Sequence, residues 1–247
     1  MNNPIEKKPV YKPAVIGFGL IILSLLAAMS GPLGSRFGWW GFEFAVNIAK
    51  WSAYMGIIAS VLCLSGFVGA WPGGKRRGFI FSLLGLGIIL PMLMYLQSWK
   101  EAKQISPPIQ DISTNTESPP EFWYAPNSRA YGGLDVATLQ DEFYPDIRPL
   151  VLPISADKAL DLSIEIIREK GWHLWETSRE EMRIEATDKT FWFGFSDDVV
   201  IYITEIDKGR SQIDMRSSSR FGGGGDGGTN ANRVRSFLAA LKKRSQG

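Results

Sequence analysis

The chain has 247 residues, and its 27 Lys and Arg against 25 Asp and Glu leave a net charge of only +2. Residues 1–106 hold ten basic and three acidic residues, whereas residues 107–247 hold 17 basic and 22 acidic residues. The acidic C-terminal part argues against nucleic acid binding, which needs a concentrated basic surface. A single cysteine, Cys63, and a single histidine, His173, exclude a Cys-based or His-rich metal site. We predict no metal and no cofactor.

Three uncharged apolar runs of 17 to 20 residues occupy the first hundred positions: Ala14–Ser30, Trp51–Ala70 and Phe79–Leu96. At about 1.5 Å per residue, each run is roughly 26–30 Å long as a helix, which matches the hydrocarbon core of a bilayer. The sequence therefore predicts a membrane anchor of three helices over residues 1–100, with the lipid bilayer as its first partner. Because none of the runs contains an ionisable residue, a transporter or channel is not expected.

The Lys and Arg residues around these runs predict the orientation, because cytoplasmic loops are enriched in them. One side of the membrane would carry six: Lys7, Lys8, Lys12, Lys75, Arg76 and Arg77. The other side would carry four: Arg36, Lys50, Lys100 and Lys103. The N-terminus is then cytoplasmic and residues 107–247 are extracytoplasmic. Ala28-Met29-Ser30 also fits a signal-peptide cleavage site, but cleavage there would leave the C-terminal domain on the same side.

Residues 101–121 contain Pro107, Pro108, Pro119 and Pro120 among polar residues, which is typical of an extended linker. Residues 122–247 are predicted to form a soluble α+β domain. We expect one helix to follow the N-cap residue Ser155 and end at Gly171, and a last helix to bury Val234, Phe237, Leu238 and Leu241. Six strands are expected, at 149–154, 172–177, 182–187, 190–195, 199–206 and 211–217. This order predicts an antiparallel sheet packed by two helices.

A glycine-rich segment after the last strand is the most distinctive local feature. Ser217-Ser218-Ser219-Arg220-Phe221 is followed by Gly222–Gly225, Asp226, Gly227 and Gly228. No second strand follows it and no acidic residue could hold a ribose, so a dinucleotide site is not expected. It is either a flexible loop before a helix capped by Thr229 or Asn230, or an anion site in which Arg220, hydroxyls and the helix start bind a phosphate or carboxylate. The residues of this tentative site are Arg216, Ser218, Arg220, Asp226, Asn230 and Arg233.

Paired carboxylates offer a catalytic alternative. Asp197, Asp198 or Asp214 could act as the acid and base of a hydrolase if two of them converged in a cleft. Adjacent residues on a strand point to opposite faces, however, so Asp197-Asp198 is better interpreted as a hairpin turn. His173 has no nucleophile motif around it. We predict no catalytic residue.

Several blocks of the sequence resemble a known family. They are Gln110–Thr114, Tyr144–Ile147, Gly171-Trp172, Ile184–Ala186, Phe195–Val199 and Asp214–Arg220, with Gly222, Asp226, Gly228, Asn230 and Arg233 after them. They resemble the bacterial and plastid family called domain of unknown function 1499, over about residues 107–240. The glycine run between Arg220 and Asp226 is longer than the family pattern. The resemblance implies a membrane-associated envelope protein and supplies no activity.

Together these features predict a multi-pass protein of the inner membrane whose periplasmic domain binds or scaffolds a partner in the cell envelope. The expected contact surface is Arg216 with the Arg220–Arg233 region, and the partner is a phosphate, a lipid headgroup, another protein or a second copy of the chain. The alternatives are an envelope hydrolase and a regulatory subunit of a membrane complex.

Overall fold

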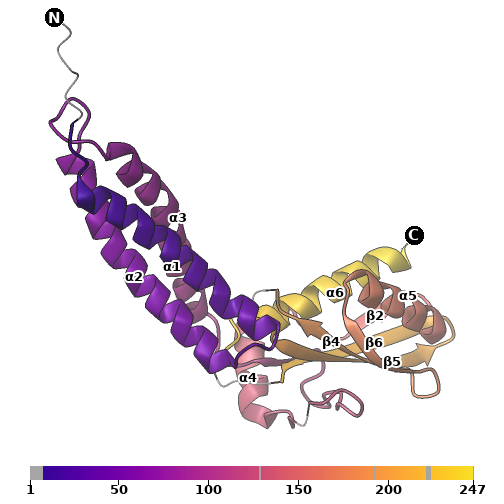
Figure 1. The fold of residues 1–247 in the computed structure, drawn as a ribbon. Helices are drawn as coiled ribbons and strands as arrows, with labels where there is room; N and C mark the ends of the chain where they lie inside the picture. The colour runs from indigo at the N-terminus through magenta and orange to yellow at the C-terminus, as the bar shows by residue number, and fades with distance from the viewer. Residues whose placement is uncertain (1–7, 128, 192, 221–223, 247) are drawn as a thin grey trace, which may run out of the picture. The chain divides into compact units, whose positions relative to one another are not determined.

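A computed structural model describes residues 8–127, 129–191, 193–220 and 224–246, apart from the side chains of residues 95, 96, 99, 100 and 102–105. The chain forms two compact units, and each is considered by itself (Figure 1). The first comprises the residues up to Lys100 together with residues 193 and 194, and the second comprises Glu101–Phe191 and the residues from Phe195 onward.

The first unit is helical. It contains α1 (Lys12–Arg36), α2 (Phe42–Gly69) and most of α3 (Phe79–Ile105). Small residues let these helices approach closely, because a methyl group on Gly66 would lie 2.7 Å from the Ala14 Cβ. The Ser24 hydroxyl of α1 also donates a hydrogen bond of 2.7 Å to the Ser52 carbonyl of α2.

Two helices, α1 and α2, are long and apolar enough to cross a membrane. Their surfaces expose apolar side chains, among them Leu26, Ile58 and Val61. We predicted three such helices, and the described residues contain two. The third, α3, has a shorter apolar stretch, Phe79–Met94. Residues 95 and 96, at the end of the third predicted span, lie outside the described side chains.

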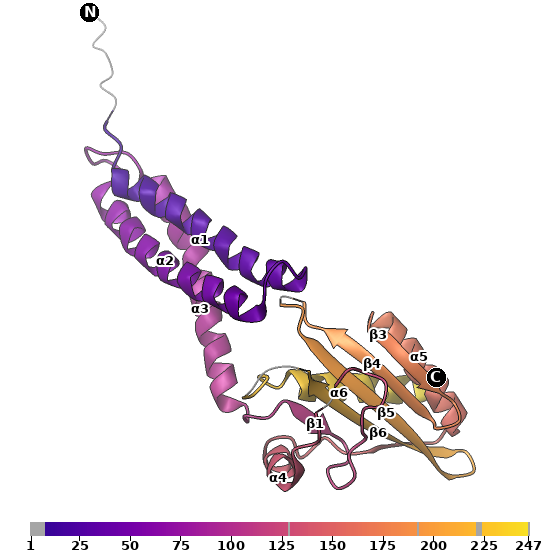
Figure 2. The ribbon, with the colours of Figure 1, turned by 60° about the horizontal axis from the view of Figure 1, so that its bottom comes forward.

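The second unit is an α+β domain built on one antiparallel sheet, as predicted. The strands are β1 (Asp111–Ser113), β2 (Leu150–Leu152), β3 (His173–Ser178), β4 (Arg183–Lys189), β5 (Ser196–Asp207) and β6 (Arg210–Ser219). They lie in the order β1-β6-β5-β4-β3, and β2 pairs with the other end of β6 on the same edge as β1. Figure 2 shows the long strands β4, β5 and β6 side by side.

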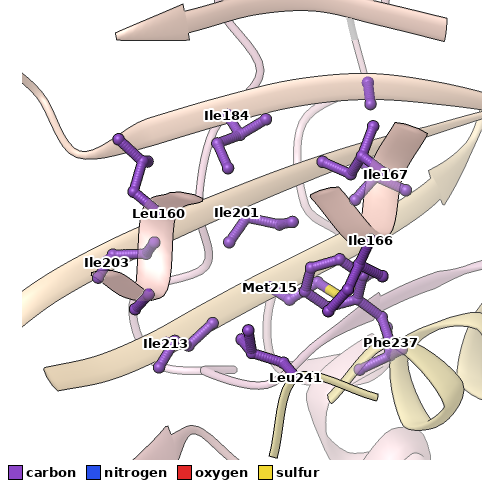
Figure 3. Packing of buried hydrophobic residues seen from close by; sticks show 14 of the residues in the cluster. Leu160, Ile166, Ile167, Ile184, Ile201, Ile203, Ile213, Met215, Phe237 and Leu241 are labelled. Atoms are coloured by element: carbon purple, nitrogen blue, oxygen red, sulfur yellow. The ribbon is translucent and has the colours of Figure 1, made fainter. Parts of the chain in front are cut away.

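Two helices, α5 (Ala156–Glu169) and α6 (Thr229–Ser245), cover one face of this sheet (Figure 1). Ser155 caps α5 by accepting a hydrogen bond from the Lys158 N–H, and Gly171 ends it with a φ of 70°, as the sequence predicts. The core between the helices and the sheet is aliphatic. Figure 3 shows its members from both layers, including Ile184, Ile201, Met215, Ile166, Ile167 and Phe237.

Three segments differ from their predictions. Residues 101–105 continue α3 and residues 111–113 form β1, so an extended linker does not describe residues 101–121. A helix that the sequence analysis did not predict, α4 (Gly133–Phe143), follows. Residues 190–195 form a connection between β4 and β5 instead of a strand, since Thr190 N–H bonds to the Phe195 carbonyl across it and Gly194 has a φ of 67°; Trp192 lies outside the described residues.

Phe237 tests this packing because it is fully buried and stacks on Trp172 at a centroid distance of 5.9 Å. We expect Phe237→Ala to lower the free energy of unfolding of the domain by about 3–5 kcal/mol, through lost burial and the cavity left behind. Denaturant-dependent proteolysis of the full chain measures this value. The control is Leu134→Ala, because Leu134 is 85% exposed and its loss should change stability by less than about 0.5 kcal/mol. Similar effects for the two variants would contradict the described core.

Candidate functional site

The two faces of the sheet carry different side chains. Val199, Ile201 and Ile203 of β5 point toward the helices, on what we call the helix face. The alternate residues of β4, β5 and β6 point to the opposite face, and they include several charged residues that are also buried. Asp197 and Asp198 lie within β5, so the hairpin turn predicted there is wrong, and the two carboxylates point to opposite faces.

On the helix face, Arg233 of α6 forms a buried ion-pair cluster. Its guanidinium donates to Asp197 at 2.7 Å and to Asp188 at 2.9 Å. It also donates to the Asn230 side-chain oxygen at 2.6 Å and to the Ser217 hydroxyl at 3.2 Å. Four acceptors within the domain therefore engage this arginine, whose side chain is only 5% exposed.

Asp226 occupies the start of α6. Its carboxylate accepts hydrogen bonds from the Gly228 N–H at 2.8 Å and the Asn230 N–H at 2.7 Å, and from the Asn230 side-chain amide at 2.7 Å. The helix is thus capped by Asp226, and not by Thr229 or Asn230. The carboxylate takes the place that an external anion would occupy at the positive end of the helix dipole. A bound phosphate would have to displace it. Residues 221–223 of the glycine run lie outside the described residues.

On the opposite face, Arg216 of β6 forms a bidentate ion pair with Asp111 of β1, with distances of 2.8 Å and 2.7 Å. The guanidinium also donates to the carbonyls of Pro120 at 3.1 Å and Arg129 at 3.0 Å. Only 2% of this side chain is exposed. Arg216 therefore binds the chain itself, in a segment that the sequence analysis took partly for a linker.

That segment, residues 119–127 and 129–131, crosses the sheet, and we call it the strap and the sheet face beneath it the strap face. Glu185 of β4 holds its middle, because the fully buried carboxylate accepts hydrogen bonds from the N–H groups of Trp123, Tyr124 and Ala125 at 2.7–2.9 Å. Arg183 donates to the same carboxylate at 3.0 Å, and the Trp123 ring lies 3.8 Å from its guanidinium carbon. Four donors leave this carboxylate with no free hydrogen-bonding capacity.

Arg220 is the most exposed of the predicted arginines, with 18% of its side chain accessible. It forms a bidentate pair with Asp198, at 3.0 Å and 2.6 Å, and donates to the Thr187 hydroxyl at 3.1 Å. The Trp175 indole N–H also donates to this hydroxyl, at 2.7 Å, and the hydroxyl in turn donates to Asp198. Arg220, Asp198, Thr187 and Trp175 therefore bond to one another, and this network links β3 to the end of β6.

Two buried hydroxyls, those of Ser218 and Tyr131, make no hydrogen bond with the described residues. Ser218 is opposite Asp111 in the sheet, and the Tyr131 ring lies 5.5 Å from the Arg216 guanidinium carbon. Burial, with a further contribution from Asp111, raises the pKa of Tyr131 to about 12. The Tyr131 hydroxyl is therefore neutral at physiological pH.

The six residues of the tentative anion site thus form two groups. Asp226, Asn230 and Arg233 meet beside α6, whereas Arg216, Ser218 and Arg220 lie on the strap face. The carboxylates of the hydrolase alternative are also separated. Asp214 of β6 lies opposite Tyr202 of β5, and Tyr202 is four positions along β5 from Asp198. The carboxylates of Asp198 and Asp214 are therefore about 13 Å apart along the strands. Within the described ranges, no group of three His, Cys, Asp or Glu side chains could bind a metal.

A set of exposed aromatic side chains lies on the strap face and was not predicted from the sequence. Trp123 and Tyr124 of the strap are 56% and 46% exposed, while Trp175 of β3 and Tyr202 of β5 are 41% and 42% exposed. Tyr202 is paired in register with Arg183, over which Trp123 stacks. We call these four side chains the aromatic platform. The only sequence signal for it is the run Phe122-Trp123-Tyr124 after two prolines.

We expect Glu185→Gln to release the strap, because an amide has one acceptor oxygen in place of two and cannot neutralise Arg183. Hydrogen exchange at Trp123, Tyr124 and Ala125 should become at least tenfold faster in this variant. Glu205→Gln is the control, since Glu205 is an exposed residue of β5. Unchanged protection of residues 123–125 would contradict the role assigned to Glu185.

Asp197 gives a pH prediction. Burial raises the pKa of this carboxyl above its ordinary value, against the opposing effects of Arg233 and Ser219. An acid with a raised folded-state pKa stabilises fully below its unfolded pKa of about 3.9, and that contribution is lost as the pH rises through the folded pKa. The unfolding free energy of the wild type should therefore fall relative to Asp197→Asn as the pH rises from the unfolded pKa through the raised folded-state pKa. Denaturant titrations at several pH values measure this difference.

The control for Asp197 has the opposite sign. Arg235 lowers the pKa of Asp146 mainly by a side-chain hydrogen bond, so the stability due to Asp146 is present above its unfolded pKa and lost as the pH falls. The unfolding free energy of the wild type should therefore rise slightly relative to that of Asp146→Asn as the pH rises. If the unfolding free energy of the wild type also rose with pH relative to that of Asp197→Asn, the prediction would be contradicted. The Arg233 ion pair would then outweigh the effect of burial on the pKa of Asp197.

Comparison with known proteins supports the resemblance noted in the sequence. No curated protein matches the chain. A family model described as "Protein of unknown function (DUF1499)" matches residues 111–241, which include all six strands of the sheet. The match begins at Asp111, the ion-pair partner of Arg216. The matched region therefore includes β1 and the strap. The chain belongs to the DUF1499 family.

Proposed function

We propose that the protein is a membrane-tethered binding module of the cell envelope, which holds a protein partner on the aromatic platform. In this proposal the tether consists of α1 and α2, and α3 adds a third crossing although its apolar stretch, Phe79–Met94, is shorter. The distribution of Lys and Arg around these helices favours a cytoplasmic N-terminus and an extracytoplasmic domain.

The observation that carries the proposal is the exposure of Trp123, Tyr124, Trp175 and Tyr202 on one face. Aromatic side chains of this size, each about half exposed, present roughly 300–500 Å² of ring surface. Trp123 and Tyr202 lie at Arg183, whereas Trp175 lies at Thr187, four positions or about 13 Å along β4. Exposed apolar surface of this extent is characteristic of interaction sites, and Trp and Tyr dominate the binding energy of protein interfaces. The exposed Glu121 and Glu176 nearby would form the polar rim of such an interface.

The platform is also held in place before any partner arrives. Glu185 fixes the backbone of Trp123 and Tyr124, and the Thr187 hydroxyl holds the Trp175 indole. Side chains that are already ordered lose little conformational entropy on binding, which favours affinity. Asp188 and Asp197 are paired in register on β4 and β5, but Arg233 binds both of their carboxylates. Carboxylates that are neutralised in this way serve the positioning of the domain, which supports binding over hydrolysis.

Crosslinking in cells tests the proposal. The full chain and the variant Tyr202→Ala combined with Trp123→Ala would be crosslinked in the membrane, and captured proteins identified by mass spectrometry. We expect the amount of the captured partner protein to be at least about tenfold lower with the double variant than with the wild type, as for hot-spot residues. Phe143→Ala on α4 is the matched control, because Phe143 is exposed to a similar extent, 41%.

Resistance to proteolysis must be the same in both variants, so that a loss of capture reports the surface and not the fold. Equal capture by the wild type and the Tyr202/Trp123 variant would contradict the proposal. If the double variant lost a crosslinked glycan but captured the same proteins as the wild type, the partner would be a carbohydrate, and the proposal of a protein partner would be wrong.

A further inference from the structure

A groove of about 320 Å³ lies on the other side of the domain, between α6 and the segment that leads into β2. Its floor is apolar and includes Leu150, Val234 and Leu238. Its rim carries three cations, Arg148, Arg235 and Lys242. A hollow of this size is at the lower end of the range for small-molecule sites, and its lining combines apolar surface with charge of one sign.

The positive rim is unusual for this domain, because residues 107–247 hold 22 acidic against 17 basic residues. Helix α6 itself contains five basic residues and no acidic one. Asp146 is the single acid among the lining residues, and Arg235 pairs with it at 2.6 Å. The groove therefore concentrates positive charge on an acidic domain.

Two of these cations, Arg148 and Lys242, are available to a ligand. The pair Arg148–Asp141 is solvent-exposed, and such a pair contributes little and exchanges partners readily. Arg235 is held more firmly, because it forms a bidentate pair with Asp146 at 2.6 Å. The Lys242 ammonium forms no ion pair with any described residue. A phosphate at the rim would gain Arg148 and Lys242 without breaking a buried interaction.

We propose that the groove binds the headgroup of an anionic phospholipid, with the phosphate on the basic rim and the start of an acyl chain over Leu150 and Leu238. The charge and the apolar floor match the two parts of such a molecule. The proposal rests on the membrane tether of the proposed function, because α1 and α2 hold the domain within reach of a bilayer and so raise the effective lipid concentration. The aromatic platform is not required for it.

The test uses the full chain in nanodiscs, with hydrogen exchange of residues 146–152 and 234–242 measured by mass spectrometry. Discs of zwitterionic phosphatidylcholine would be compared with discs that also contain phosphatidylglycerol. We expect exchange in both segments to slow at least threefold in the anionic discs, and this protection to weaken at high salt. Inorganic phosphate added to zwitterionic discs should give no comparable protection.

The variant Arg148→Gln combined with Lys242→Gln should lose the lipid-dependent protection. Lys158→Gln, an exposed charge on α5, should keep it. Equal exchange in the two kinds of disc, or equal protection by free phosphate, would overturn the groove proposal and leave the tether standing. Failure of the chain to enter discs of either composition would overturn the tether and the groove proposal together.

Discussion

The domain depends on the neutralisation of charges that its sheet buries on the face away from its helices. Glu185 is the centre of this arrangement, since one carboxylate satisfies Arg183 and three backbone N–H groups of the strap. An ionised group in such a position would be costly without these partners, and the strap would be unattached without the carboxylate. Sheet and strap therefore stabilise each other, and both are needed to complete the fold.

This interdependence explains why the charged blocks of the family pattern are poor candidates for ligand contacts. Arg216, Arg220 and Arg233 each form ion pairs with an aspartate of the domain, and Asp226 caps α6. The residues that look functional in the sequence hold the strap, the sheet edge and the last helix in register. Their geometric effect is to present Trp123, Tyr124 and Trp175 on a rigid surface, which is where we place the partner.

Helices α5 and α6 and most strands could be predicted from periodicity, whereas α4 and β1 could not. The alternation of Ile184 and Ala186 with Arg183 and Glu185, for example, identifies β4. The same alternation cannot distinguish a solvated outer face from a covered one, since a buried arginine and an exposed one look alike in a sequence. What covers the face is the strap, which is held largely by its backbone N–H and carbonyl groups, and backbone groups leave no residue signature. Thr190–Phe195 was taken for a strand because it is aromatic and β-prone, but the connection of β4 to β5 requires a turn there.

The central claim is that the aromatic platform is covered by a partner in the membrane and exposed in the isolated protein. Hydroxyl-radical footprinting of Trp123 and Trp175, in intact membranes and in the purified full chain, measures this directly. The account predicts that both indoles are oxidised in the purified protein and protected in membranes, while Phe143 reacts equally in the two. Equal oxidation of the two tryptophans in both preparations would contradict it.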